Sequence, residues 1–363
     1  MTLMDDMHKF GHEQVLFSYD AVTGCRAIIA IHDTTLGPAL GGCRVIDYAD
    51  QSKALKDALL LSRGMTYKAA VAGLPLGGGK AVVMGDVNRL RSRAFFHAFG
   101  RFVNSFAGRY ITSVDMNTRY EDLRWMSEVS PYVSGLVYSA EQGGVSYATA
   151  VGVYYGLKAA LKDRLSCDSF AGLRVAVQGV GSVGASLCEF LHEDGAQLVV
   201  ADINNERLET MVKKYGASVV DTDAIHAHDV DVYAPCARGG ILNDQTIPEM
   251  KAKIVGGAAN NQLEDPDRHG ALLAERGILY APDYVINAGG LMHASYGLDG
   301  ASHSDLMVKV KGIEATLDDI FSQSKKEGVL PHLISYAIGK KHILEAKKHT
   351  QPFSQAYKPP FKK

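Results

Sequence analysis

The stretch LRVAVQGVGSVGASLCEFLHEDGAQLVVAD, residues 173–202, predicts the fold of the second half of the chain. It has the pattern of a short buried strand, a glycine-rich turn, a helix and a second buried strand that ends at Asp202. The turn contains G-x-G-x-x-G at Gly179, Gly181 and Gly184, between a strand and a helix. Strand and helix patterns alternate further along the chain. We therefore predict a Rossmann domain with a doubly wound parallel sheet.

This turn is expected to bind the pyrophosphate of a dinucleotide, because glycines let the backbone approach it and the helix start offers unpaired N–H groups. Asp202, about 20 residues on, could accept hydrogen bonds from both ribose hydroxyls and repel a 2′-phosphate. Ile203 and the two asparagines after it include no arginine for that phosphate, so NAD is favoured over NADP. The alternative is that Asp202 only caps a helix or turn. The predicted cofactor-binding turn comprises Gly179, Val180, Gly181, Ser182, Val183 and Gly184, with Asp202 and Ile203 beyond it.

The first half of the chain has a different pattern. Two apolar runs joined by Thr23-Gly24 predict a β-hairpin, and later segments alternate between helix and strand patterns. Thr118 and Glu121 fit a helix capping box. We expect an α/β fold of two domains. These are a substrate-binding and oligomerisation domain at 1–140, completed by C-terminal helices at about 328–363, and an NAD-binding domain at 141–327.

Composition excludes several classes of function. The 363 residues are 47% hydrophobic and 21% charged, which is ordinary for a globular protein. The formal net charge is −2, so there is no excess of basic residues to bind nucleic acid or an anionic membrane. No apolar run is long enough to cross a membrane. The five cysteines are odd in number and none has metal-ligand spacing, so we expect no metal site and a cytoplasmic location.

Two lysines have unusual local sequences. Lys68 lies in RGMTYKAAVAG and Lys80 in LPLGGGKAVV, both apolar and without an acidic residue nearby. Burial and a neighbouring cation each lower a lysine pKa, so one lysine could act as a general base while the other binds a substrate carboxylate. The alternative is two ordinary surface lysines. Asp115 ends a probable strand, where it could equally be a turn or cap residue.

Taken together, these segments resemble the glutamate/leucine/phenylalanine/valine dehydrogenase family, and most closely its leucine and phenylalanine branches. The resemblance runs from HEQVLF to about residue 292. It includes AIIAIHDTTLGPALGGCR, RGMTYKAAVAGLPLGGGKAV, GRYITSVDMNT, VQGVGSVG, VYAPCARGGILND, GGAANNQL and APDYVINAGG.

The resemblance implies an NAD-dependent enzyme that converts an L-amino acid to its 2-oxo acid and ammonium, reversibly. Lys68 would bind the α-carboxylate, Lys80 would activate the water that attacks the imine carbon, and Asp115 would move protons to and from the amino group. It also implies a cleft between the domains and a homo-oligomer, an octamer or a dimer. Further cofactor-binding positions are Thr149, Cys236, Ala237, Ala258, Asn260 and Asn287, and further substrate-binding positions are Leu40, Gly41, Ser113, Asn261, Leu291 and Ala294.

Leu40 decides against one substrate class. Glutamate dehydrogenases resemble GPYKGG where this chain has GPALGG, and Leu40 stands at the lysine position. Burying the side-chain carboxylate of glutamate without a cation would cost several kcal/mol. An apolar substrate is expected, with leucine and other branched-chain acids first, then phenylalanine, then tryptophan. An asparagine at position 117 resembles tryptophan dehydrogenases, whereas leucine enzymes usually have glycine there. The segment HASYGLDG at 293–300 also departs from the pattern usual in leucine and phenylalanine enzymes.

Two other classes of function are disfavoured by the sequence. A catalytically silent NAD-binding regulatory protein would be expected to lack a catalytic lysine or the aspartate, and all three are present. A hydroxy-acid dehydrogenase would need a histidine base, and none of the 13 histidines has a matching context.

Overall fold

The computed structural model describes residues 3–136, 144–351 and 356–359. Two compact units are present: residues 1–142 with 294–301 and 338–363, and residues 143–293 with 302–337. The predicted boundary between residues 140 and 141 lies outside the described residues.

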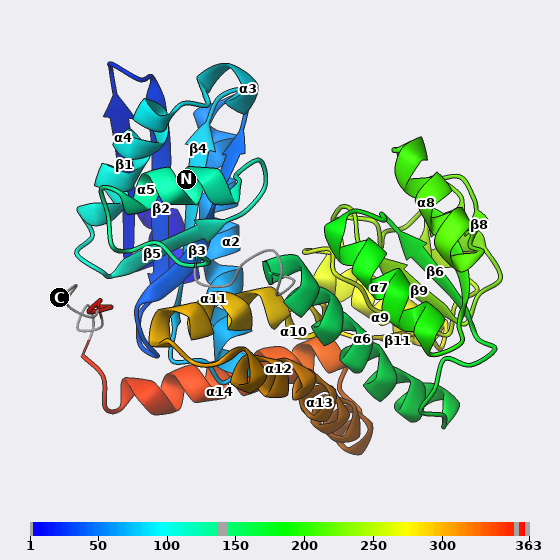
Figure 1. Ribbon diagram of the computed structural model, residues 1–363. Helices are drawn as coiled ribbons and strands as arrows, with labels where there is room; N and C mark the ends of the chain where they lie inside the picture. The colour runs from blue at the N-terminus through cyan, green and yellow to red at the C-terminus, as the bar shows by residue number, and fades with distance from the viewer. Residues whose placement is uncertain (1–2, 137–143, 352–355, 360–363) are drawn as a thin grey trace. The chain divides into compact units, whose positions relative to one another are not determined.

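The first unit is built on a mixed five-stranded sheet (Figure 1). The predicted hairpin is present, because β1 and β2 pair antiparallel from Gln14↔Ile31 to Asp20↔Cys25. β4 pairs antiparallel with β2 and parallel with β3, which in turn pairs parallel with β5. The strand order is β1-β2-β4-β3-β5, with β1 (Gln14–Asp20), β2 (Cys25–Asp33), β3 (Ala39–Ile46), β4 (Gly77–Met84) and β5 (Tyr110–Val114).

Helices cover both faces of this sheet. On one face, Ala54, Ala58 and Leu59 of α2 (Gln51–Val71) pack on Ile28 and Val82. On the other face, the phenylalanine-rich α4 (Arg93–Asn104) and α5 (Tyr120–Ser127) share a core with the strand side chains that point away from α2, such as Cys43 and Val45. Alternation along each strand therefore assigns every side chain to one of two distinct environments. The remaining helices that begin in this unit are α1 (Leu3–Phe10) and α3 (Val87–Leu90).

The second unit contains a six-stranded parallel sheet (Figure 1). Its order, β11-β10-β9-β6-β7-β8, starts at the central β6 and grows first to one side and then to the other, as in a doubly wound Rossmann sheet. The strands are β6 (Arg174–Gln178), β7 (Gln197–Ala201), β8 (Ser218–Val219), β9 (Val232–Pro235), β10 (Ile254–Val255) and β11 (Leu279–Tyr280). The predicted Rossmann domain is confirmed.

Helices flank this sheet and continue after it. The first of them, α6 (Gly144–Leu165), packs along α7 and α13. The others are α7 (Ser182–Glu193), α8 (Asn205–Tyr215), α9 (Pro266–Glu275), α10 (Asp283–Ile286), α12 (His303–Lys311) and α13 (Ile313–Glu327). Two helices contain residues of both units, α11 (Gly289–Asp299) and α14 (Pro331–Lys347).

Candidate active site in the family fold

The α2 face of the first sheet gathers most of the predicted catalytic and substrate-binding residues. Val82 packs against α2, so Lys80, two residues earlier on β4, points to the same face. Cys43 and Val45 belong to the opposite core, so Leu40 and Arg44 on β3 also point toward α2. Ser113 and Asp115 have the corresponding parity on and just after β5, whose Tyr110 and Val114 pack in the opposite core.

Lys80 and Asp115 form a close ion pair. The register places Gly78 opposite Leu40 and Val114 opposite Cys43, so β3 lies between the two strands that carry the pair. Lys80 Nζ lies 2.6 Å from Asp115 Oδ2, and their side chains are 8% and 21% exposed. The acidic partner that the sequence near Lys80 lacks is therefore supplied by a strand two positions away in the sheet.

Glycines permit this close packing. A Cβ on Gly42 would lie 2.4 Å from the Val114 carbonyl oxygen and 2.7 Å from the Asp115 Cβ. On β4, a Cβ on Gly78 would lie 2.1 Å from Thr66 Oγ1, where α2 crosses the strand. A side chain at Gly42 would push Asp115 away from β3, and one at Gly78 would push away the helix that carries Lys68.

Asp115 is held in its ionised form. Burial by itself opposes ionisation, but the charges of Lys80 and Arg44 outweigh it and hold the pKa of Asp115 well below its usual value. Arg44 Nε donates to the same Oδ2 atom at 3.0 Å. Asp115 is therefore a carboxylate between two cations.

The loop after Asp115 is fixed by its own hydrogen bonds. Thr118 Oγ1 accepts from the Asp115 backbone N–H at 2.8 Å and lies 3.0 Å from the Cys43 carbonyl oxygen. The predicted capping box of Thr118 and Glu121 is wrong: α5 starts one residue later, and Asp122 caps it by accepting from the Arg119 N–H. Thr118 instead positions the backbone of Asp115.

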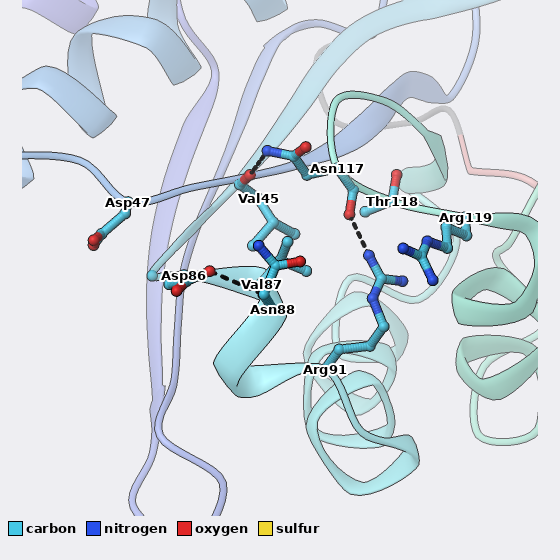
Figure 2. A pocket seen from close by; sticks show the side chains of 10 residues that line it. Val45, Asp47, Asp86, Val87, Asn88, Arg91, Asn117, Thr118 and Arg119 are labelled. Atoms are coloured by element: carbon cyan, nitrogen blue, oxygen red, sulfur yellow. Dashed lines mark hydrogen bonds between the residues drawn. The ribbon is translucent and has the colours of Figure 1, made fainter. Parts of the chain in front are cut away.

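Asn117 has a left-handed backbone, with φ +63°. Glycine and asparagine are the residues that tolerate this conformation best, so the exchange of one for the other preserves the turn. Asn117 lines a hollow of about 430 Å³. As Figure 2 shows, its side-chain amide donates to the Val45 carbonyl, at 2.9 Å, and its backbone carbonyl accepts from the Arg91 side chain. The contacts of Asn117 are therefore with the protein backbone and Arg91.

The other predicted residues of the first unit lie as follows. Lys68 is half-buried in the last turn of α2, and Leu40 and Ser113 are buried on neighbouring strands. The Gly41 carbonyl accepts from Tyr110 Oη at 2.6 Å. The buried Ala294 begins the segment 294–301, and its carbonyl accepts from Ser134 Oγ at 2.6 Å.

In the second unit the glycine turn has the geometry of a phosphate cradle. Gly179 has φ +92°, and a Cβ there would lie 2.7 Å from the Cβ of Ala237. A Cβ on Gly184 would lie 1.9 Å from the Gly179 carbonyl oxygen, so α7 can start directly against the turn. Gly181 is the N-cap of α7 and supplies no side chain to its first N–H groups. The cradle, which includes Val180, Ser182 and Val183, fits a dinucleotide pyrophosphate.

Asp202 directly follows β7 with its carboxylate partly engaged. Its Oδ2 accepts from the Val180 N–H at 2.8 Å and its Oδ1 from the Asn204 N–H at 2.9 Å. Each carboxylate oxygen can accept a second hydrogen bond, so a ribose remains compatible with this position. Ile203 next to it is 93% exposed. Arg207 Nη1 lies 3.9 Å from Asp202 Oδ2.

A second cluster in this unit surrounds Asn287. Its Nδ2 donates to the Ala258 carbonyl at 3.1 Å and to Asn260 Oδ1 at 2.8 Å. Thr149 on α6 donates to the Val145 carbonyl, and a Cβ on Gly290 would lie 2.8 Å from its Oγ1. The remaining predicted positions are Asn261 (exposed, φ +52°), Cys236 and Ala237 (half-buried and exposed, just after β9) and Leu291 (buried).

Within the described residues, no cluster of three or more histidine, cysteine or acidic side chains is arranged to hold a metal ion. Among the helices of the same part of the chain, none is long and apolar enough to cross a membrane.

Family comparisons match both units. Residues 12–132 match the Glu/Leu/Phe/Val dehydrogenase dimerisation domain, and residues 143–206 and 199–330 match the glutamate/leucine/phenylalanine/valine dehydrogenase domain. The chain belongs to the glutamate/leucine/phenylalanine/valine dehydrogenase family. The predicted family, two-domain α/β fold and enzyme class, an amino-acid dehydrogenase, are confirmed.

Members of this family with different named substrates are similarly close to the chain. It is 46% identical over 356 residues to the leucine dehydrogenase of Geobacillus stearothermophilus, covering 98% of this chain and 97% of that one. It is 47% identical over 329 residues to an L-tryptophan dehydrogenase of Nostoc punctiforme, covering 91% and 92%. The crystal structure of L-tryptophan dehydrogenase from Nostoc punctiforme superposes with a TM-score of 0.81 at 44% identity, covering 95% of this chain and all of that one. Overall similarity therefore does not separate these substrates.

Sequence reasoning missed two charged residues at these sites. Arg44 contacts Asp115, and Arg207 approaches Asp202. The signal for Arg44 was its place in GGCR, two residues after Gly42 on the strand that carries Leu40. Arg207 gave no local signal, because it does not directly follow Asp202 but lies in the first turn of α8, after Asn204.

Proposed function

We propose that this protein catalyses the NAD-dependent oxidative deamination of apolar L-amino acids, with leucine and other branched-chain acids preferred, and the reverse reductive amination. The observation that carries the proposal is the ion pair of the buried Lys80 with the half-buried Asp115, on the sheet face that also carries Leu40. The amino and carboxylate groups of an amino-acid substrate need charged partners in the protein. The apolar side chain of the substrate needs none, and Leu40 offers none.

The roles proposed for the three charged residues are those that the family resemblance implies. Lys68 binds the substrate α-carboxylate as a cation. Lys80 takes a proton from the water that attacks the imine carbon, and Asp115 exchanges protons with the amino nitrogen as the carbinolamine forms and collapses. The products are the 2-oxo acid and ammonium.

We infer that the cofactor is NAD, and the glycine turn of the second unit supports this inference. When bound, NAD accepts the hydride from the substrate Cα. The glycine turn at 179–184 would hold the pyrophosphate, Asp202 and Ile203 the adenosine half, and the cluster of Thr149, Asn287 and Asn260 the nicotinamide half. Ala258 belongs to this cluster, and Cys236 and Ala237 line the turn on the adenosine side. Asp202 favours NAD because its carboxylate would lie against a 2′-phosphate, while Arg207 moderates that repulsion.

One observation disfavours glutamate, and a second removes an argument for tryptophan. Leu40 is 2% exposed and offers no partner to a carboxylate, which disfavours glutamate. Asn117 matches tryptophan enzymes, but its left-handed backbone and its contacts with Val45 and Arg91 account for it without an aromatic substrate. The positions proposed to contact the substrate are Lys68, Leu40, Gly41, Ser113, Asn261, Leu291 and Ala294.

We also propose a homo-oligomer, supported by the match of residues 12–132 to a dimerisation domain. The described cysteines are all unpaired thiols, which supports a reducing compartment such as the cytoplasm.

The proposal is tested by steady-state kinetics on leucine, valine, phenylalanine, tryptophan and glutamate, each with NAD⁺ and with NADP⁺. We expect kcat/KM to be highest for leucine, and valine, one methylene smaller, to be lower by roughly 10-fold. Glutamate should be at least about 100-fold poorer than leucine. Glutamate as the best substrate would overturn the argument from Leu40, and equal use of NADP⁺ would overturn that from Asp202.

A further inference from the structure

Arg44 sits beside the catalytic pair and none of the assigned roles includes it. It follows Gly42 and Cys43 on β3, so the register that pairs Cys43 with Val114 brings it next to Asp115. Its Nε lies 3.0 Å from Asp115 Oδ2, the atom that also contacts Lys80 Nζ at 2.6 Å. The side chain is 14% exposed, so this contact is largely shielded from water.

A second acid fixes the other end of the guanidinium. Arg44 Nη1 donates to Asp57 Oδ2 at 3.3 Å, and Tyr48 Oη donates to the same oxygen at 2.6 Å. Asp57 lies on α2, the helix that carries Lys68. Two anchors on different elements hold the planar guanidinium in one orientation, which an ammonium could not match.

The two cations at Asp115 differ in permanence. Lys80 gains and loses a proton in the proposed reaction, so its attraction for Asp115 changes during turnover. An arginine stays protonated throughout. Burial opposes the charge of Arg44, but Asp115 and Asp57 more than compensate and raise its pKa above the usual value.

We propose that Arg44 is a positioning residue: a permanent cation, clamped by Asp57 and Tyr48, that keeps the Asp115 carboxylate ionised and in place while Lys80 changes its protonation state. Both cations contact Oδ2, so Oδ1 is the oxygen that we expect to face the substrate nitrogen. This inference rests on the proposed function.

Asp115 contacts Lys80 on β4 and Arg44 on β3, and Asp57 on α2 contacts Arg44. Lys68 lies on the same helix as Asp57. Behind the sheet, burial raises the pKa of Cys43 and of Tyr110 far above their usual values, so both are neutral at ordinary pH. A change in the acid limb of the pH profile on removal of Arg44 therefore comes from the Lys80–Asp115 pair and not from Cys43 or Tyr110.

The test compares Arg44→Gln, Arg44→Lys and Asp57→Asn with wild type, using the amino acid that wild type turns over best. Arg26→Ala, an exposed arginine on β2 of the same sheet, is the control. We expect Arg44→Gln to lower kcat by roughly 10- to 100-fold, to change KM by less than about 3-fold, and to move the acid limb of the kcat profile to higher pH. Arg44→Lys should restore the acid limb and only part of kcat. Asp57→Asn should lower kcat less than about 10-fold with the limb unchanged.

Thermal melting of each variant separates folding from chemistry. An Arg44→Gln protein that melts like wild type and keeps its kcat and pH profile overturns the proposal. So does an Arg44→Lys protein that shows the same loss and the same pH profile as Arg44→Gln, because that result indicates packing. Wild type that oxidises a different amino acid overturns the substrate assignment but leaves this comparison intact.

Discussion

Gly42→Ala should damage activity through geometry alone. The added Cβ would lie 2.4 Å from the Val114 carbonyl oxygen and 2.7 Å from the Asp115 Cβ, whereas ordinary contacts begin at 3.4 Å. The strands β3 and β5 must therefore separate by about 1 Å, the difference between 3.4 and 2.4 Å. Overpacking of this kind costs roughly 1–3 kcal/mol of unfolding free energy.

The same displacement moves Asp115 away from Lys80, to which it is now 2.6 Å distant. A misplacement of about 1 Å at a catalytic group can lower the rate about 100-fold, so we expect a kcat loss of that order. Urea unfolding and steady-state kinetics measure the two effects.

Gly64→Ala is the matched control. Gly64 lies within α2 and a Cβ there would meet no atom within 4 Å, so alanine should stabilise the helix by roughly 0.5–1 kcal/mol and leave kcat unchanged. Wild-type stability and kcat in Gly42→Ala would refute the argument that this glycine sets the position of Asp115.

Two further predictions concern the cofactor and pH. Asp202→Ala should raise kcat/KM with NADP⁺ relative to that with NAD⁺. The double variant Asp202→Ala with Arg207→Ala should raise this ratio less, because Arg207 would attract the 2′-phosphate. An unchanged ratio in the single variant would contradict the role of Asp202. His32 is buried between Thr66 and the Phe10 carbonyl, and burial, with the adjacent His12, lowers its pKa from 6.5 to about 4. The unfolded chain takes up this proton first, so stability is fully present above about pH 6.5 and falls by roughly 3 kcal/mol as the pH drops to about 4. Urea unfolding across this range should show a smaller fall in His32→Gln, and an identical fall would contradict the assignment.

The sequence was sufficient for the second unit because its signals are local. The turn at Gly179 to Gly184 lies between a strand and a helix that are adjacent along the chain, so one continuous segment specifies the cradle. The hydrogen bond from the Val180 N–H to Asp202 was not foreseeable, because it joins the ends of two separate segments.

The Lys80–Asp115 ion pair could not be predicted from local sequence. Lys80 and Asp115 meet because β3 lies between β4 and β5, an order set by tertiary packing. For the same reason the apolar surroundings of Lys80 in sequence gave no sign of its acidic partner. For Thr118 a local pattern was present but misleading. Its sequence fitted a capping box, but its hydroxyl accepts a hydrogen bond from the Asp115 backbone N–H.

The central claim, that Lys80 and Asp115 form the catalytic centre of an amino-acid dehydrogenase, is tested most directly by Lys80→Ala. Turnover of leucine should fall by at least roughly 100- to 10,000-fold, the contribution of a positioned general base. Titration calorimetry on the same protein should show NAD⁺ binding with the wild-type affinity, because the glycine turn at 179–184 belongs to the second unit. Near-normal turnover in this variant would contradict the account.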